Sequence, residues 1–189
     1  MQKLPVDKQL PFFKVIMENG NLKDLENWIY QEPSLLEVLG NDDYYELISL
    51  DFNQKFVLDS IQRIIFPYVD YTNYYLHHLK DILLSLQNQP NDMPLLAKVY
   101  ELYCHGYEFL QSLAIDYGLV AKVELIENSR FSFSSESLNE VRIQSKLIYD
   151  ALVDKKIVLL ACPSFDKDIE YYQDFRSETE KSLTALKIG

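Results

Sequence analysis

The side chains with the most reactive chemistry in this sequence are three histidines and two cysteines, and their spacing limits what they can do. His77 and His78 are adjacent, so on a helix they point about 100° apart and do not chelate one ion together. Asp81 lies four residues beyond His77 on the same helical face, which would supply half of a metal site. No HExxH sequence completes that site, so we interpret the pair as part of a solvated helix face with a local hydrogen bond.

Cysteine and carboxylate chemistry is also incomplete. Cys104 and His105 are neighbours, but a catalytic cysteine needs a base that the fold positions in space. Cys104 lies beside an apolar helical seam, which indicates a buried structural thiol. Glu101 and Glu108 lie one heptad apart, without the Glu-x-x-His sequence that di-iron bundles use.

Glycine motifs for phosphate binding and for nucleophile elbows are absent. The chain has only 5 glycines, and none forms a GxxxxGK[ST], GxGxxG or GxSxG sequence, which need glycine for close backbone approach. This disfavours nucleotide-dependent and α/β-hydrolase chemistry. We therefore predict a protein that is not an enzyme, with no catalytic residues, no metal site and no cofactor.

The charge of the chain indicates the kind of partner. Lys and Arg number 18 against 29 Asp and Glu, a net charge of -11. Nucleic-acid phosphates are repelled by such a field, whereas a basic protein or a cationic ligand is attracted. The alternative is that the acidity serves solubility alone.

The termini and cysteines indicate a compartment. Cys104 and Cys162 are far apart and have no metal-binding spacing. The N-terminal sequence MQKLPVDKQLPFF lacks the apolar run of a signal peptide, and no stretch approaches the roughly 20 apolar residues that span a bilayer. We predict a cytoplasmic protein with reduced thiols and no membrane contact.

Residues 21–52 form the stretch that organises the chain. Gly20-Asn21 reads as a helix stop followed by a helix start, and Gly40-Asn41 as a second such boundary. Apolar residues recur between them at helical spacing and include Trp28, the single tryptophan. We predict a compact helical subdomain with Trp28 in its core. The alternative is that its acidic, tyrosine-rich surface binds a basic partner.

The tyrosines form two clusters, Tyr44-Tyr45 and a group between residues 68 and 75. Their neighbouring charges are acidic, with Asp42, Asp43 and Asp70, whereas single-stranded nucleic-acid binding interleaves aromatic and basic residues. Core packing with hydroxyls at the rim is the first interpretation. A surface that mimics phosphates and meets a basic cleft is the alternative.

The same stretch carries a resemblance. The pattern Leu-Glu-x-Trp-Ile-Tyr, Leu-Leu-Glu-x-Leu-Gly and Tyr-x-Glu-Leu-Ile-Ser-Leu-Asp-Phe resembles a segment of small acidic bacterial proteins associated with polymorphic toxin systems, including proteins of the immunity type. The matching residues are Leu25, Glu26, Trp28, Ile29, Tyr30, Leu35, Leu36, Glu37, Leu39, Gly40, Tyr45, Glu46, Leu47, Ile48, Ser49, Leu50, Asp51 and Phe52. The resemblance implies an inhibitor of a cognate toxin.

The remaining chain reads mostly as amphipathic helices. They are expected at 9–19, 54–66, 68–87, 94–117 and 136–153, and Cys162-Pro163-Ser164 starts a final helix that carries Phe165, Ile169, Tyr172, Phe175, Leu183 and Leu186. Gly106 lies on the seam of the 94–117 helix, where another helix could approach closely. Two segments, 120–126 and 155–161, read as strands that could pair, or equally as helix continuations.

We therefore expect a mostly α fold, a multi-helix bundle with a small two-stranded β-ribbon in the last third where those segments are strands. The chain 1–189 is expected to be one helical domain, with a candidate subdomain boundary at the polar loop 87–94. The expected function is a binding protein that neutralises a toxin by covering a basic surface. The alternative is an adaptor that holds a partner helix, and an enzyme with an unrecognised site is a third class. The predicted partner-binding residues are Asp42, Asp43, Tyr44, Tyr45, Glu46 and Asp51.

Overall fold

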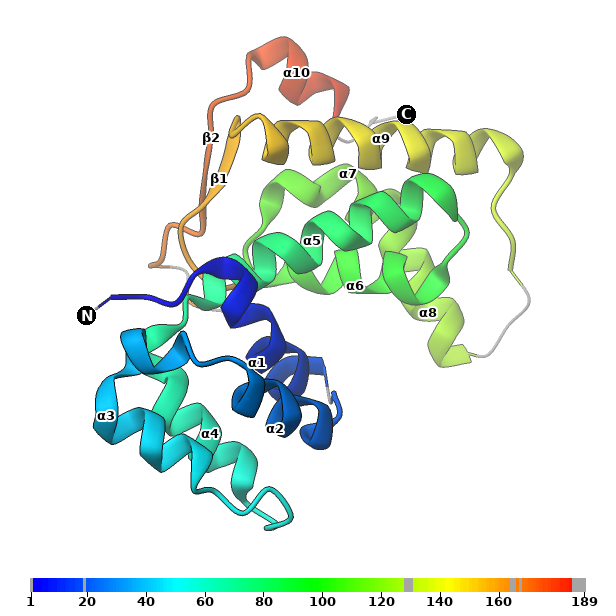
Figure 1. Ribbon diagram of the computed structural model, residues 1–189. Helices are drawn as coiled ribbons and strands as arrows, with labels where there is room; N and C mark the ends of the chain where they lie inside the picture. Colours follow the sequence, from blue (N-terminus) through cyan, green and yellow to red (C-terminus); the bar gives the residue numbers. More distant parts are fainter. Residues whose placement is uncertain (1, 19, 128–130, 164–165, 167, 185–189) are drawn as a thin grey trace. The chain divides into compact units, whose positions relative to one another are not determined.

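The chain folds into helices with one short β-ribbon, as predicted from the sequence (Figure 1). The structure is a computed structural model that describes residues 2–18, 20–127, 131–163, 166 and 168–184. Two compact units follow one another, residues 1–74 (the first unit) and residues 75–189 (the second unit). The division falls within helix α5, and the single-domain organisation stays a prediction.

The first unit consists of helices packed around an apolar core. They are α1 (Val6–Glu18), α2 (Leu22–Gln31), α3 (Leu35–Ile48), α4 (Val57–Ile65) and the 3₁₀ turn η1 (Phe66–Tyr68). Helices α1 and α3 each contact both α2 and α4. Fully buried side chains from all four helices meet in this core, among them Phe12, Ile29, Leu47 and Ile61.

Local sequence explains where α2 and α3 begin and bend. The Asn21 side chain accepts a hydrogen bond of 2.8 Å from the backbone N–H of Lys23 and caps α2, as its type predicts. Gly40 has a φ of 74° and bends α3 into two segments. That left-handed conformation suits glycine because it has no Cβ, so the predicted boundary at Gly40-Asn41 is present as a bend.

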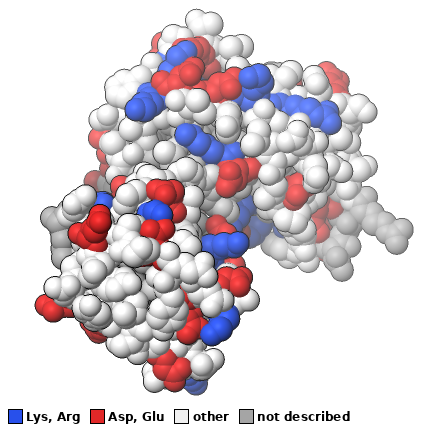
Figure 2. Space-filling model, in the orientation of Figure 1, with Lys and Arg blue, Asp and Glu red and all other residues white. Residues whose placement is uncertain are grey.

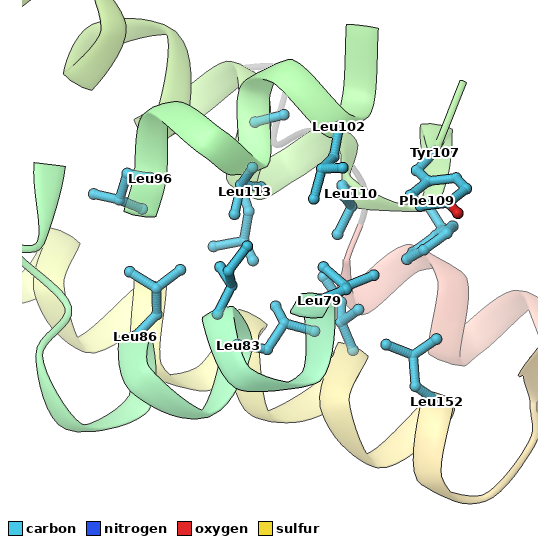
Figure 3. Packing of buried hydrophobic residues seen from close by; sticks show 14 of the residues in the cluster. Leu79, Leu83, Leu86, Leu96, Leu102, Tyr107, Phe109, Leu110, Leu113 and Leu152 are labelled. Carbon is cyan, nitrogen blue, oxygen red and sulfur yellow. The ribbon is translucent and has the colours of Figure 1, made fainter. Parts of the chain in front are cut away.

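The second unit has its core between α5, α6 and α9. Its elements are α5 (Tyr71–Asn88), α6 (Met93–Cys104), η2 (Glu108–Leu110), α7 (Gln111–Leu113), η3 (Ala114–Gly118), α8 (Leu119–Glu127), α9 (Ser135–Val153), β1 (Ile157–Leu159), β2 (Tyr172–Asp174) and α10 (Glu178–Leu183). Leu79, Leu83 and Leu86 of α5 point toward leucines of α6 and of the segment after it (Figure 3). Burial of these side chains is the main stabilising contribution in this unit.

The predicted helix over 94–117 is wrong in its middle. Helix α6 ends at Cys104, and Gly106 adopts a φ of 109° in the turn that follows. A Cβ on Gly106 would lie 2.3 Å from the ring of Tyr171, so the glycine makes room for this ring and not for a second helix. Since the seam stops there, Cys104 is exposed and not buried as predicted.

The segment 120–126 lies in helix α8 and is not a strand. Ala114, Gly118 and Ala121 are buried at helical spacing and lie on one side of a continuous helical stretch that packs on α6. A Cβ on Gly118 would lie 2.7 Å from the carbonyl oxygen of Leu96. The small residues therefore permit a close helix contact, which outweighs the short alternating pattern.

The ribbon contains only one of the two predicted strands. Strand β1 lies within the predicted 155–161 segment and pairs antiparallel with β2, with Ile157 opposite Asp174 and Leu159 opposite Tyr172. Strand β2 and the short α10 replace most of the predicted final helix. Ser177 and Glu180 form a reciprocal capping box at α10, a strong local start signal. Ser164, Phe165 and Leu186 of that prediction lie outside the described residues.

Leu83→Ala should lower the free energy of unfolding by about 2–5 kcal/mol, because it leaves a cavity in the core of the second unit. Leu84 is the matched control, since it lies next in the chain and is 46% exposed. Leu84→Ala should change the stability by less than about 1 kcal/mol. Urea unfolding followed by circular dichroism measures both, and equal losses would contradict the packing described here.

Candidate functional site

The predicted partner-binding residues lie on the second half of α3, beyond the bend at Gly40, and in the turn that follows. Asp42, Tyr45 and Asp51 are exposed, whereas Asp43, Tyr44 and Glu46 are partly buried. Neighbouring residues on a helix point about 100° apart, so one stretch of sequence supplies side chains both to the surface and to the interior.

Asp43 forms a hydrogen bond inside the first unit. The Tyr68 hydroxyl donates a hydrogen bond to its carboxylate and lies 3.0 Å from the carbonyl oxygen of Leu39. This hydrogen bond, together with burial and the negative charge of Asp43, raises the pKa of Tyr68 to about 12. Asp43 therefore holds α3 against the segment after α4, and it contributes little to an outer surface.

Glu46 and Asp51 also have internal partners. Glu46 pairs with Arg63 of α4, and the hydrogen bond and charge of Glu46 raise the pKa of that guanidinium. Asp51 accepts a hydrogen bond of 3.0 Å from the backbone N–H of Asn53 and closes the turn after α3. Glu46 is partly exposed and Asp51 is exposed, but both carboxylates already interact with other groups of the chain.

Asp42 and Tyr45 form the outward part of the predicted surface. Tyr45 is 57% exposed, and its ring meets that of Tyr44 edge to face with centroids 5.8 Å apart. Within the described residues, Asp42 has no ion-pair partner. An exposed ring beside an uncompensated carboxylate can contact an apolar group and a cation together.

Tyr30 of α2 adds to this surface, and the sequence analysis did not single it out as a site residue. It is 55% exposed, and its hydroxyl donates to the carbonyl oxygen of Ile48 at 3.0 Å. This contact puts Tyr30 at the end of α3, one turn beyond Tyr45. We call Asp42, Tyr45 and Tyr30 the α3 surface.

The first unit carries a large share of the negative charge. Residues 1–74 contain twelve of the 29 acidic residues and only six of the 18 basic ones. On the face shown in Figure 2, acidic and basic side chains are interspersed among uncharged areas and do not merge into one acidic patch. The field that a partner meets is therefore a diffuse negative one, with local contacts set by single side chains.

Trp28 differs from its predicted position in the core. Its side chain is partly buried, meets Phe12 edge to face at 5.4 Å, and forms one wall of a pocket of about 350 Å³ between α1 and α2. The periodicity of α2 placed Trp28 on the apolar face correctly. The pocket arises because α1 leaves part of this large ring uncovered.

A second pocket of about 250 Å³ between α9 and α10 has several charged side chains in its lining, and both of its basic residues, Arg176 and Lys156, are ion-paired. Arg176 is 7% exposed and donates to the Asp174 carboxylate and, at 2.7 Å, to the Thr184 hydroxyl. Burial alone would raise the pKa of Asp174, but the hydrogen bonds and charge of Arg176 outweigh it and lower this pKa. Lys156 pairs with Glu180 at 2.5 Å. These pairs hold α10 in place and occupy the cations of this pocket.

The described residues contain no group of three or more His, Cys, Asp or Glu side chains that could hold a metal ion. Among the described residues, neither Cys104 nor Cys162 forms a disulfide bond. Among the helices of the described ranges, none has the length and apolar character needed to cross a membrane.

Comparisons with protein-family models, with curated proteins and with solved structures found no match to this chain. The resemblance of residues 21–52 to immunity-type proteins stays an expectation.

Tyr68→Phe should lower the free energy of unfolding at pH 7 by about 1–3 kcal/mol, because Asp43 and the Leu39 carbonyl lose a buried donor. The raised pKa predicts the pH dependence: the neutral phenol stabilises the fold below its ordinary pKa of 10, and this contribution is lost as the pH rises to about 12. The variant should therefore lose less stability than the native chain over that interval. Denaturant unfolding at several pH values measures this, with the exposed Tyr30→Phe as control, and an equal loss in both variants would contradict the assignment.

Proposed function

We propose that this chain is a non-enzymatic binding protein for a basic protein partner, and that it acts by occlusion. The observation that carries the proposal is the outward pair on α3. The carboxylate of Asp42, which has no ion-pair partner among the described residues, lies one turn from the 57% exposed ring of Tyr45. Tyrosine is enriched among the residues that dominate binding energy at protein interfaces. Tyr30 extends the same surface with a second exposed ring.

Charge and aromatic contact would have separate roles in such a complex. The net charge of -11 attracts a basic partner over a distance and raises the association rate. The tyrosine rings of the α3 surface are buried only after docking, so they slow dissociation. Together these properties suit an inhibitor that covers a basic cleft.

The resemblance of residues 21–52 supports the toxin-immunity form of this proposal. In that form the basic surface is the active-site cleft of a cognate toxin, and the chain neutralises the toxin by blocking access to it. Since phosphate-binding clefts are basic, an acidic side chain beside an aromatic ring can take the place of a phosphate and a base.

One observation favours the adaptor alternative. Helix α8 exposes Leu119, Val123 and Ile126 at helical spacing, and Ile126 is 73% exposed. Such a stripe is typical of a helix that packs against another helix. Binding through α8 would depend only weakly on salt, because it would involve few charges.

Affinity capture of the tagged chain from extracts of its own cells, at low and high salt, tests the proposed function. We expect one basic protein at stoichiometric level, weakened by salt, and lost when Asp42→Lys and Tyr45→Ala are combined. The reason is that these changes reverse the charge at position 42 and remove the exposed ring of Tyr45 from the α3 surface. Mass spectrometry identifies the partner and its amount.

The matched control is Asp81→Lys, which makes the same charge reversal at an exposed position in the second unit. It should leave capture unchanged. The absence of any stoichiometric partner at either salt concentration would contradict the proposal. Capture that survives the combined variant and high salt would favour α8 over the α3 surface.

A further inference from the structure

The pocket between α1 and α2 has the walls of a site for one large apolar side chain. Leu10 and Pro11 of α1 face Leu25 and Trp28 of α2 across it, and Val15 also lines it. Its volume of about 350 Å³ lies at the lower end of the range for ligand sites. A phenyl or branched aliphatic group with part of its neighbouring chain fits that space.

The pocket also has polar side chains in its lining, which among the described residues are two carboxylates, one lysine and Asn21. Asp7 and Asp24 line it from the first turns of α1 and α2, and Lys14 is the one cation among its lining residues. In the part of the chain that the structure describes, neither Asp24 nor Lys14 forms an ion pair. Asp24 is therefore a carboxylate of this pocket that is not paired with Lys14 or another described cation, whereas Asp7 lies 3.9 Å from the ammonium of Lys8.

Pro11 affects the hydrogen bonding of the backbone in α1. It lies inside α1, and proline has no N–H to donate to the carbonyl four residues earlier, which belongs to Asp7. Both residues line the pocket. The Asp7 carbonyl therefore lacks the N–H donor that an α-helix usually supplies four residues later.

We propose that this pocket binds a segment of the basic protein partner in which one apolar or aromatic side chain is flanked by lysine or arginine. The apolar side chain enters the pocket against the Trp28 ring, and the flanking cations meet Asp24 and Asp7. A cation beside an indole also gains from the negative face of the ring. The inference rests on the proposed function for the nature of the partner, but the site is separate from the α3 surface.

Nuclear magnetic resonance on the full ¹⁵N-labelled chain tests the inference directly. Trp28 is the single tryptophan, so the spectrum contains one indole N–H signal, and this signal reports on the pocket. The probe is the peptide acetyl-Lys-Phe-Lys-amide, compared with acetyl-Lys-Ala-Lys-amide, acetyl-Glu-Phe-Glu-amide and phenethylamine. We expect the first peptide alone to shift the indole signal in a saturable way, with a Kd on the order of 1 mM.

Two matched pairs of variants locate the contact. Asp24→Asn should weaken binding of acetyl-Lys-Phe-Lys-amide about two- to fivefold, as for an exposed ion pair, whereas Asp59→Asn should not. Leu10→Ala should weaken it by about tenfold through loss of apolar contact. Met17→Ala is its control, because Met17 lies on the same helix with the same 37% exposure and does not line the pocket.

Each other outcome overturns the inference. An equal shift with the alanine peptide means attraction by surface charge without an anchor, and an equal shift with the glutamate peptide means that charge has no part. If phenethylamine binds as tightly as the peptide, the pocket is a site for free amines. If the peptide gives no saturable shift of the indole signal at millimolar concentration, the pocket is not a binding site for it.

The two proposals fail separately. If the peptides fail but a basic protein is still captured through Asp42 and Tyr45, only the pocket is wrong. If acetyl-Lys-Phe-Lys-amide binds as described and no protein partner is captured from extracts, the proposed function is wrong and the pocket remains a site for such segments.

Discussion

The buried hydroxyl of Tyr68 is the contact on which the outer surface of α3 depends. It lies between the Leu39 carbonyl and the Asp43 carboxylate, which belong to opposite sides of the bend at Gly40. Because both acceptors are held by one group, the rotation of the second half of α3 about its axis is fixed. Asp42 directly precedes Asp43 on the helix and must then point about 100° away, toward solvent.

This constraint explains why the acidic cluster divides into two kinds of residue. The acids with partners inside the first unit stabilise it, and their charges are partly neutralised. Turning Asp43 outward would break its hydrogen bond with the buried Tyr68 hydroxyl, so this carboxylate stays with its partner inside the first unit. An exposed carboxylate such as Asp42 loses little hydration on folding, and its charge stays available for binding.

Periodicity and turn chemistry predicted the helical class, the Asn21 cap and the boundary at Gly40, because each depends on residues close together in the sequence. They failed where distant residues decide the outcome. The turn at Gly106 is determined by the ring of Tyr171, and the helical state of residues 120–126 by the fit of small side chains against α6. Asp42 and Tyr45 were named as candidate site residues from residue type and stretch, whereas Tyr30 was not. The partners of Asp43 and Glu46, which are Tyr68 and Arg63, lie 17 or more residues away and left no local signal.

The α3 surface and the pocket share helix α2 but lie on different sides of it. Trp28 lines the pocket with α1, whereas Tyr30 contacts the end of α3. Trp28 and Tyr30 are two positions apart on the helix, which turns their directions by about 200°. Their rings therefore point in nearly opposite directions. A single flat interface cannot cover both. A partner that uses both must reach around α2 with a second segment, and a short peptide with one apolar side chain between two basic ones is the simplest segment that fits the second site.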